Sequence, residues 1–94
     1  MFGLIRKMRA APGKRADLIA ILGDNAESIP GCRHYIVMED ASDPDGIWIT
    51  EVWDDEESHK ASLQLESVRA AIAKARPIIA GFDMSVKTRP IYGV

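Results

Sequence analysis

Two kinds of segment alternate along this 94-residue chain, and their order limits its fold more than any other feature. Four short segments are rich in β-branched and large apolar residues, or alternate apolar with polar positions, which is typical of strands. They are residues 2–10, 32–39, 47–53 and 81–88. Two longer segments, from Lys14 to about Ser28 and from Asp54 to Arg76, carry apolar residues at helical spacing. The predicted order is strand, helix, strand, strand, helix, strand.

Turn-forming residues mark the ends of these segments. Residues 29–31 (Ile-Pro-Gly) end the first helix, because proline cannot continue the helical hydrogen bonds and glycine tolerates the turn. Residues 40–46 are a run of turn formers long enough to join the two central strands as a hairpin. Asp54 followed by Glu57 resembles a capping box and predicts the start of the second helix.

The chain also contains a weak internal repeat. Residues 29–31 precede the second strand, and a similar Ile-Ala-Gly at residues 79–81 precedes the fourth. A helix followed by a glycine-led strand, twice over, is the split βαβ or ferredoxin-like pattern. We therefore predict an α+β protein with a four-stranded antiparallel sheet. The length suits a single domain over residues 1–94.

Apolar residues occupy both faces of the predicted strands. In the third strand, Ile47, Ile49 and Trp53 alternate with Trp48 and Val52, and successive strand residues point to opposite faces. Two helices on one side cover only one face, and soluble monomers rarely expose a large apolar patch. We expect a homodimer that packs sheet face against sheet face, an α+β barrel. The alternative is that the hairpin loop and the C-terminal tail cover the second face.

Charged residues are unevenly distributed. The first fifteen residues hold five bases and no acid, whereas residues 39–57 hold nine acids and no base. Either these are solvated faces, or the two segments meet across an interface or at the mouth of a pocket. The net charge is −2, so there is no basic excess to favour nucleic acid or anionic lipid.

Several classes of protein are excluded or disfavoured. The longest uncharged runs have six residues, far short of the ~18 that a membrane span needs. The first charges follow a short apolar stretch, the reverse of a signal peptide, and the lone Cys32 has no internal disulfide partner. We expect a cytoplasmic protein. Scattered glycines give no phosphate-binding loop, and the spacing of His34, His59 and Cys32 does not predict a metal site.

The sequence resembles the antibiotic biosynthesis monooxygenase domain family. The matching stretches are residues 12–15 after the first strand, 30–32 with Tyr35 at the second, 51–53 in the third, and 57–62 in the second helical region. The resemblance implies a ferredoxin-like protomer in a dimeric α+β barrel, with a pocket between sheet and helices. It also implies a monooxygenase that oxidises a quinol, or a polycyclic phenol or anthrone-type substrate, with dioxygen and without flavin, haem or metal.

This chain departs from the family pattern at one position. Many members carry a histidine three residues beyond His59, where this chain has Ser62. His59 lies nearly one helical turn earlier, and it can take that role only if it faces the pocket. The related haem-degrading branch needs an axial histidine further along this helix, and residues 68–75 contain none.

Cofactor-free oxygenation requires a general base and a dry cavity for an aromatic ring. His59 is the first candidate, because imidazole titrates nearest neutral pH, and the alternative is a surface histidine. His34 is a weaker candidate, either in the site or on an exposed strand. Trp53 is a candidate pocket wall with its indole N–H directed at a substrate oxygen, or else a core residue. Tyr35 either orients a phenolate or lies in the dimer contact.

Five further residues are candidates for substrate binding or for packing. Glu51 lies among apolar residues, so it either pairs with an arginine of the first strand or has a catalytic role. Ser62 is a candidate donor to a bound oxygen. Met8, Met38 and Met84, on separate strands, either line a pliable pocket or fill the core.

Two functional hypotheses follow. The first is the cofactor-independent monooxygenase that the resemblance implies. The second is a non-catalytic dimeric barrel that binds a small aromatic ligand or acts in a stress response. The orientation of His59 and Trp53 distinguishes them, because only the first needs a base that faces the pocket.

Overall fold

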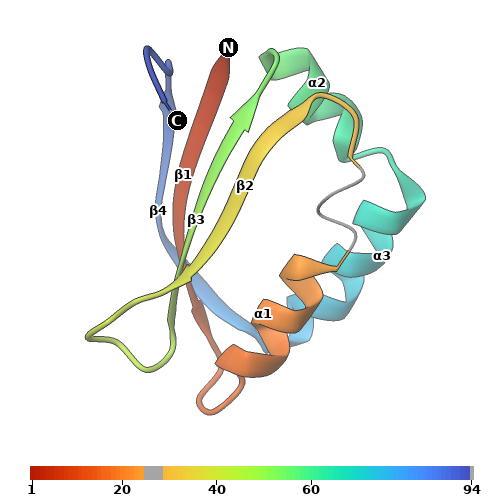
Figure 1. Cartoon of the computed structure of the whole chain (residues 1–94). Coiled ribbons are helices and arrows are strands. Elements are labelled where there is room, and N and C mark those ends of the chain that lie inside the picture. Colours follow the sequence, from red (N-terminus) through yellow and green to blue (C-terminus); the bar gives the residue numbers. More distant parts are fainter. Residues whose placement is uncertain (25–28, 94) are drawn as a thin grey trace.

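The computed structural model describes residues 1–24 and 29–93, and its elements follow the predicted order (Figure 1). The strands are β1 (Phe2–Ala10), β2 (Cys32–Glu39), β3 (Gly46–Trp53) and β4 (Ile79–Thr88). The helices are α1 (Arg15–Gly23), α2 (Glu56–Ser62), α3 (Glu66–Ala75) and the short 3₁₀ helix η2 (Arg76–Ile78). The strand boundaries therefore agree with the sequence prediction to within two residues.

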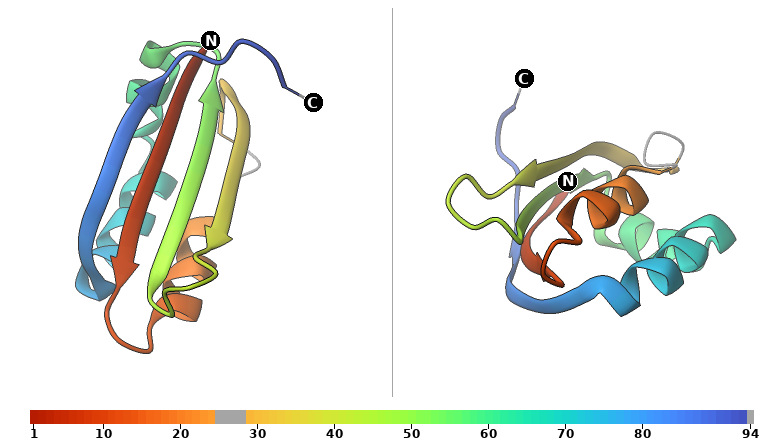
Figure 2. Two further views of the ribbon diagram at one scale, coloured as in Figure 1. Left: turned by 90° about the vertical axis from the view of Figure 1, so that its left-hand side faces the viewer. Right: turned by 90° about the horizontal axis from the view of Figure 1, so that it is seen from below.

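The four strands form one antiparallel sheet in the order β2-β3-β1-β4. The helices lie together over one face of this sheet, and the other face carries none of them (Figures 1 and 2). The element order and the strand order confirm the ferredoxin-like α+β fold. We call the helix-covered side the inner face and the opposite side the outer face.

The helices differ from the prediction at the end of α1, at a break inside the second predicted helix and at the cap of α2. Helix α1 ends at Gly23, since glycine and Asp24 are weak helix formers and the backbone of Asp24 is extended. The predicted continuation to Ser28, with Ala26 on its apolar stripe, lies outside the described residues. The predicted second helix is divided, because the extended backbone of Leu65 separates α2 from α3. This break lets α3 turn and pack beside α1 (Figure 1).

The cap of α2 is one residue later than predicted. Asp55, not Asp54, is the N-cap, and its carboxylate accepts a hydrogen bond from the backbone N–H of Ser58 at 2.7 Å. Asp54 instead accepts from Arg33 at 2.5 Å, which ties the end of β3 to β2. A long-range ion pair therefore takes the carboxylate that sequence alone assigned to the cap.

The core lies between the inner face and the helices. It is built from alternate residues of β1 and β3 together with Leu18 of α1 and Ala75 of α3. Ile47 and Ile49 are fully buried, as their period-two spacing predicts. Burying side chains of this size contributes roughly 1.5–3 kcal/mol each, so this layer fixes the sheet against the helices.

The outer face remains apolar and exposed. Ile36, Met38, Met84 and Val86 are each between 39% and 50% exposed. The hairpin loop lies at one end of this face, and at the other end Pro90 packs over Gly3. Neither segment covers the middle, so the alternative that loop and tail bury this face is wrong.

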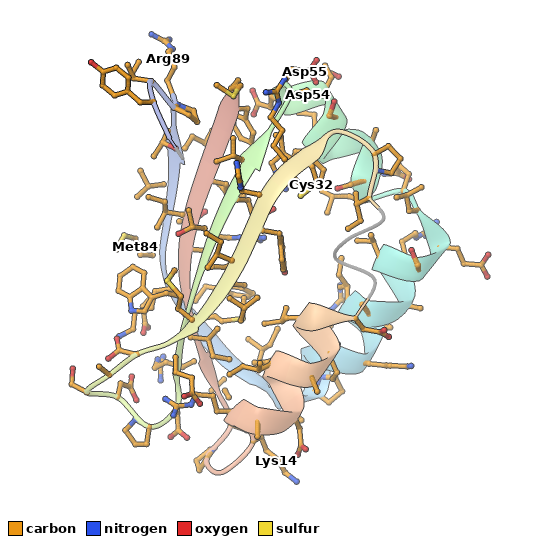
Figure 3. The ribbon with its side chains drawn as sticks, viewed as in Figure 1. Lys14, Cys32, Asp54, Asp55, Met84 and Arg89 are labelled. Carbon is orange, nitrogen blue, oxygen red and sulfur yellow. The ribbon has the colours of Figure 1, made fainter. Side chains whose placement is uncertain are left out.

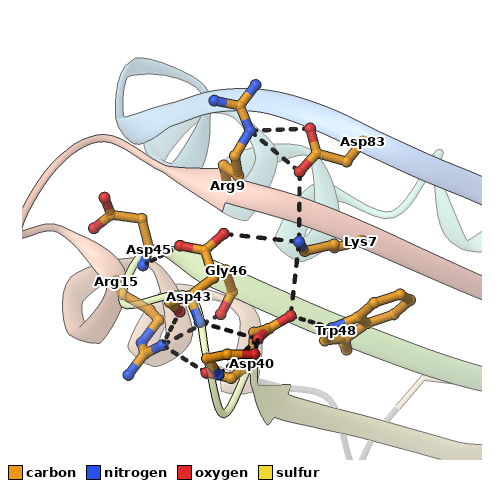
Figure 4. Close-up of polar contacts among 10 residues, drawn as sticks. Lys7, Arg9, Arg15, Asp40, Asp43, Asp45, Gly46, Trp48 and Asp83 are labelled. Carbon is orange, nitrogen blue, oxygen red and sulfur yellow. Dashed lines mark hydrogen bonds and ion pairs between the residues drawn. The ribbon is translucent and has the colours of Figure 1, made fainter.

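Ion pairs anchor the hairpin loop to β1 and α1 (Figure 4). Lys7 Nζ lies 3.6–3.8 Å from carboxylates of Asp40, Asp43 and Asp83. Arg15 donates to the carbonyl oxygen of Asp43 at 2.8 Å. The basic N-terminal segment and the acidic segment therefore meet, and these contacts at Lys7 and Arg15 stabilise the hairpin loop.

Among the described residues, no helix has the length and apolar character needed to cross a bilayer.

Candidate active site

A cavity of about 480 Å³ lies between the inner face of the sheet and the helices. Its volume is within the range of small-molecule sites, about 300–1,000 Å³. Most of its lining is apolar, and five polar side chains gather on the wall formed by the sheet and α2. These are Arg6, Tyr35, Glu51, His59 and Ser62. The cavity therefore suits a ring system with a few polar substituents.

Glu51 is the centre of this polar wall. Its side chain is only 2% exposed, and each carboxylate oxygen has a partner. Arg6 Nη2 donates to Oε2 at 2.5 Å, and Trp53 Nε1 donates to Oε1 at 3.0 Å. The predicted pairing of Glu51 with an arginine of the first strand is confirmed. The pair offsets the cost of burying a charge among apolar residues.

Trp53 forms part of the cavity wall and is 2% exposed. Its indole N–H is already used by Glu51, so the reading in which it is directed at a substrate oxygen is wrong. The hydrogen bond fixes the ring plane instead. Trp53 thus presents a rigid aromatic surface to whatever occupies the cavity.

His59 projects from α2 onto the same wall. The centroid of its ring lies 5.3 Å from that of Trp53, in an edge-to-face arrangement, and 5.7 Å from that of Phe2. Partial burial holds the pKa of His59 below its ordinary value of 6.5; the nearby Glu51 opposes this shift and Arg6 reinforces it. Glu56 and Lys87 act in smaller and opposite senses. The imidazole is therefore neutral at pH 7 and able to accept a proton.

Ser62 lies one helical turn after His59 and lines the same cavity. Its hydroxyl donates to the backbone carbonyl oxygen of His59 at 2.6 Å, so that hydrogen is not directed at a bound oxygen. Residues three apart on a helix share a face. His59 consequently reaches the cavity although it stands three positions before the usual family histidine.

Tyr35 lies opposite Glu51 on the neighbouring strand β2 and lines the cavity. Burial, assisted by the negative charge of Glu51, raises the pKa of Tyr35 to about 12. The phenol therefore stays protonated at neutral pH and is a hydrogen-bond donor. Tyr35 faces inward, away from the proposed sheet-to-sheet contact.

The structure places three candidate residues away from the cavity. His34 and Met38 lie on the outer face of β2, because they alternate with Tyr35. Met84 projects from the outer face of β4, on the side of the sheet opposite the helices (Figure 3). Only Met8 of the three methionines lines the cavity. A count of apolar strand residues does not by itself distinguish the two faces.

Arg6 is the functional residue that the sequence reasoning did not single out. It shares the inward parity of Leu4 and Met8 in β1, and a charged residue at such a position was the available signal. Phe82, 60% exposed at the cavity, was likewise overlooked because a bulge in the pairing of β1 with β4 turns it inward. Bulges are not visible in strand periodicity.

In the part of the chain that the structure describes, no group of three His, Cys, Asp or Glu side chains is arranged to hold a metal ion. Fold and cavity together define a ferredoxin-like α+β protein with a mostly apolar cavity between its sheet and its helices.

Comparison with known proteins identifies the family. The antibiotic biosynthesis monooxygenase model matches residues 1–74, so the chain belongs to that family. No match was found among curated protein sequences. Family membership supports a monooxygenase-like function in general terms.

Solved structures show the same fold. A crystal structure from Chloroflexus aurantiacus J-10-fl, described as a "putative antibiotic biosynthesis monooxygenase", is 59% identical, with a TM-score of 0.96. The match covers 99% of this chain and 95% of that one. A similarly described Nitrosomonas europaea structure is 16% identical with a TM-score of 0.86, and covers 98% of this chain and 100% of that one. This second likeness concerns the fold alone.

Proposed function

We propose that this protein is a cofactor-independent monooxygenase that oxidises a quinol, or a polycyclic phenol or anthrone-type substrate, with dioxygen. The observation that carries the proposal is the position of His59, a neutral imidazole at the edge of a mostly apolar cavity beside the ring of Trp53. A non-catalytic binding protein has no need of a proton acceptor facing its ligand.

The chemistry starts with proton transfer. His59 takes the acidic proton of the substrate, and the electron-rich anion then passes one electron to dioxygen. For an anthrone, the substrate radical and superoxide combine at the ring carbon, and return of the proton from His59 gives a hydroperoxide. Loss of water from that hydroperoxide leaves the carbonyl of a quinone, so that one oxygen atom enters the product and the other enters water. The apolar lining excludes bulk water from these intermediates.

Oxygen consumption tests the proposal directly. We expect the wild-type protein to consume oxygen with menadiol or an anthrone faster than buffer does, and His59→Ala to lose most of this rate. General-base catalysis contributes typically 10²–10⁴-fold. His34→Ala, on the outer face, is the matched control and should retain the wild-type rate.

Two outcomes would contradict this function. Wild-type rates equal to those in buffer would remove it, and tight binding of a quinone without turnover would favour the aromatic-binding alternative. If His59→Ala consumed oxygen as fast as wild type, the protein would be an oxygenase, but His59 would not be its general base.

We also propose that two copies associate through their outer faces. The exposed side chains of Ile36, Met38, Met84 and Val86 support this, since soluble monomers rarely expose such a patch. Four strands ~4.8 Å apart and ~26 Å long give a flat face of roughly 500 Å², and projecting side chains add to its accessible area. That approaches the ~800 Å² per partner of a standard stable interface. Sedimentation showing a 10 kDa species at micromolar concentration would contradict the dimer.

A further inference from the structure

Arg6 has more hydrogen-bonding capacity than the described part of the protein uses. A guanidinium group carries five N–H donors. The described contacts use one nitrogen of Arg6, Nη2, which is bonded to Glu51. Its Nε atom is buried and has no hydrogen-bond partner among residues 1–24 and 29–93. Such an unsatisfied buried donor is costly unless a bound molecule supplies an acceptor.

The described side chains of the polar wall make no hydrogen bond to that Nε atom. Glu51 accepts from Nη2 of Arg6 and from the indole N–H of Trp53. Tyr35 keeps its proton, so its hydroxyl can donate. Arg6 is 30% exposed and lines the cavity, so Glu51 fixes the guanidinium through Nη2 while the exposed part of the side chain, which does not include Nε, faces the cavity.

We propose that Arg6 binds the oxyanion of an aromatic ligand, so that the cavity selects ring systems bearing an ionised hydroxyl. The proposal rests on the proposed function, because it names the form in which the substrate is held after His59 has taken its proton. Tyr35 is placed as a second donor to that oxygen. An anionic ligand in the cavity supplies an acceptor to the exposed N–H groups of Arg6 that Glu51 does not use.

A pair of coloured naphthoquinone probes tests this in the full-length protein. The two naphthoquinones are similar in size, but 2-hydroxy-1,4-naphthoquinone is an anion at neutral pH and 2-methyl-1,4-naphthoquinone is neutral. Quenching of tryptophan fluorescence gives both dissociation constants, since Trp53 forms part of the cavity wall. Both probes are already oxidised, so the result does not depend on whether the protein turns over a quinol.

The informative variant removes both charges of the pair. Arg6→Met combined with Glu51→Gln leaves no unpaired buried charge and keeps an acceptor for the N–H of Trp53. We expect the anionic probe to bind at least roughly tenfold more weakly, as for loss of a charged hydrogen bond, and the neutral probe to bind unchanged. Arg9→Gln, on the outer face of the same strand, removes an arginine charge that does not line the cavity and should leave both affinities at the wild-type level.

A second measurement needs no variant and so does not depend on its folding. The absorption of the hydroxynaphthoquinone changes on ionisation, which gives its pKa when free and when bound. Contact with Arg6 should lower that pKa, whereas burial in an apolar cavity alone would raise it. A raised ligand pKa would overturn the proposal. So would a double variant that binds both probes equally more weakly, or one that binds the anionic probe as tightly as wild type does.

Discussion

Replacement of Glu51 by glutamine tests whether the polar wall of the cavity is an integral part of the fold. Glu51 is 2% exposed and is bonded to Arg6 and Trp53. Glutamine keeps an acceptor for the indole N–H but removes the charge opposite Arg6. Breaking a fully buried ion pair costs about 3–5 kcal/mol. Because Arg6 keeps 30% exposure and some solvation, we expect a smaller loss of ~2–3 kcal/mol.

That loss is large for a protein of this size, whose whole stability is about 5–14 kcal/mol. The melting temperature should fall by roughly 10–20 °C. Urea unfolding followed by circular dichroism, at one fixed protein concentration, measures the loss in free energy of unfolding. Glu57→Gln is the matched control, because the side chain of Glu57 is 84% exposed and its loss should change stability by less than ~0.5 kcal/mol. A Glu51→Gln loss no larger than that of the control would refute the reasoning.

Three further predictions concern other parts of the molecule. Because the pKa of His59 is lower in the folded protein, the unfolded state binds the proton more readily. The free energy of unfolding of wild type should therefore fall relative to that of His59→Gln as pH falls from 7 through 6.5. Urea titrations that show the reverse trend would contradict the lowered pKa. Ile36→Glu with Val86→Glu should yield monomers in sedimentation, and an unchanged mass would place the interface elsewhere. Gly31→Ala should cost at least ~1–2 kcal/mol in urea unfolding, because its φ is +81° and a Cβ would meet Ser58 at 2.6 Å. Gly23→Ala, with open space around it in α1, should instead be neutral or stabilising by up to ~1 kcal/mol, and equal effects at the two glycines would count against this account.

Ser62 and His59 are three residues apart in α2 and both line the cavity. Ser62 occupies the position of the usual family histidine, and in this chain its hydroxyl is bonded to the backbone of α2. His59, one turn earlier on the same face, reaches the cavity and contacts Trp53. The imidazole therefore enters the cavity from a neighbouring point on its wall rather than from the family position.

Local patterns were sufficient for the strands and their order. Period-two alternation in β3 marks Ile47, Ile49 and Trp53 as a buried row, and all three are buried. The same reasoning placed Glu51 in that row and predicted its arginine partner from the cost of an unpaired buried charge. It failed at the helix ends, because Asp54 is drawn away from the cap by Arg33, a residue 21 positions distant.

The amino-acid sequence by itself determined the order of elements, the two apolar faces of the sheet and the need to neutralise Glu51, since these follow from periodicity and from the energetics of a single buried charge. Only the tertiary structure decided which face lines the cavity, that the indole of Trp53 is bonded to Glu51, and that Arg6 and His59 share one wall. The reason is geometric: strand pairing, a bulge between β1 and β4 and the break between α2 and α3 bring together residues that lie far apart in the sequence, such as Arg6 and His59, 53 positions apart.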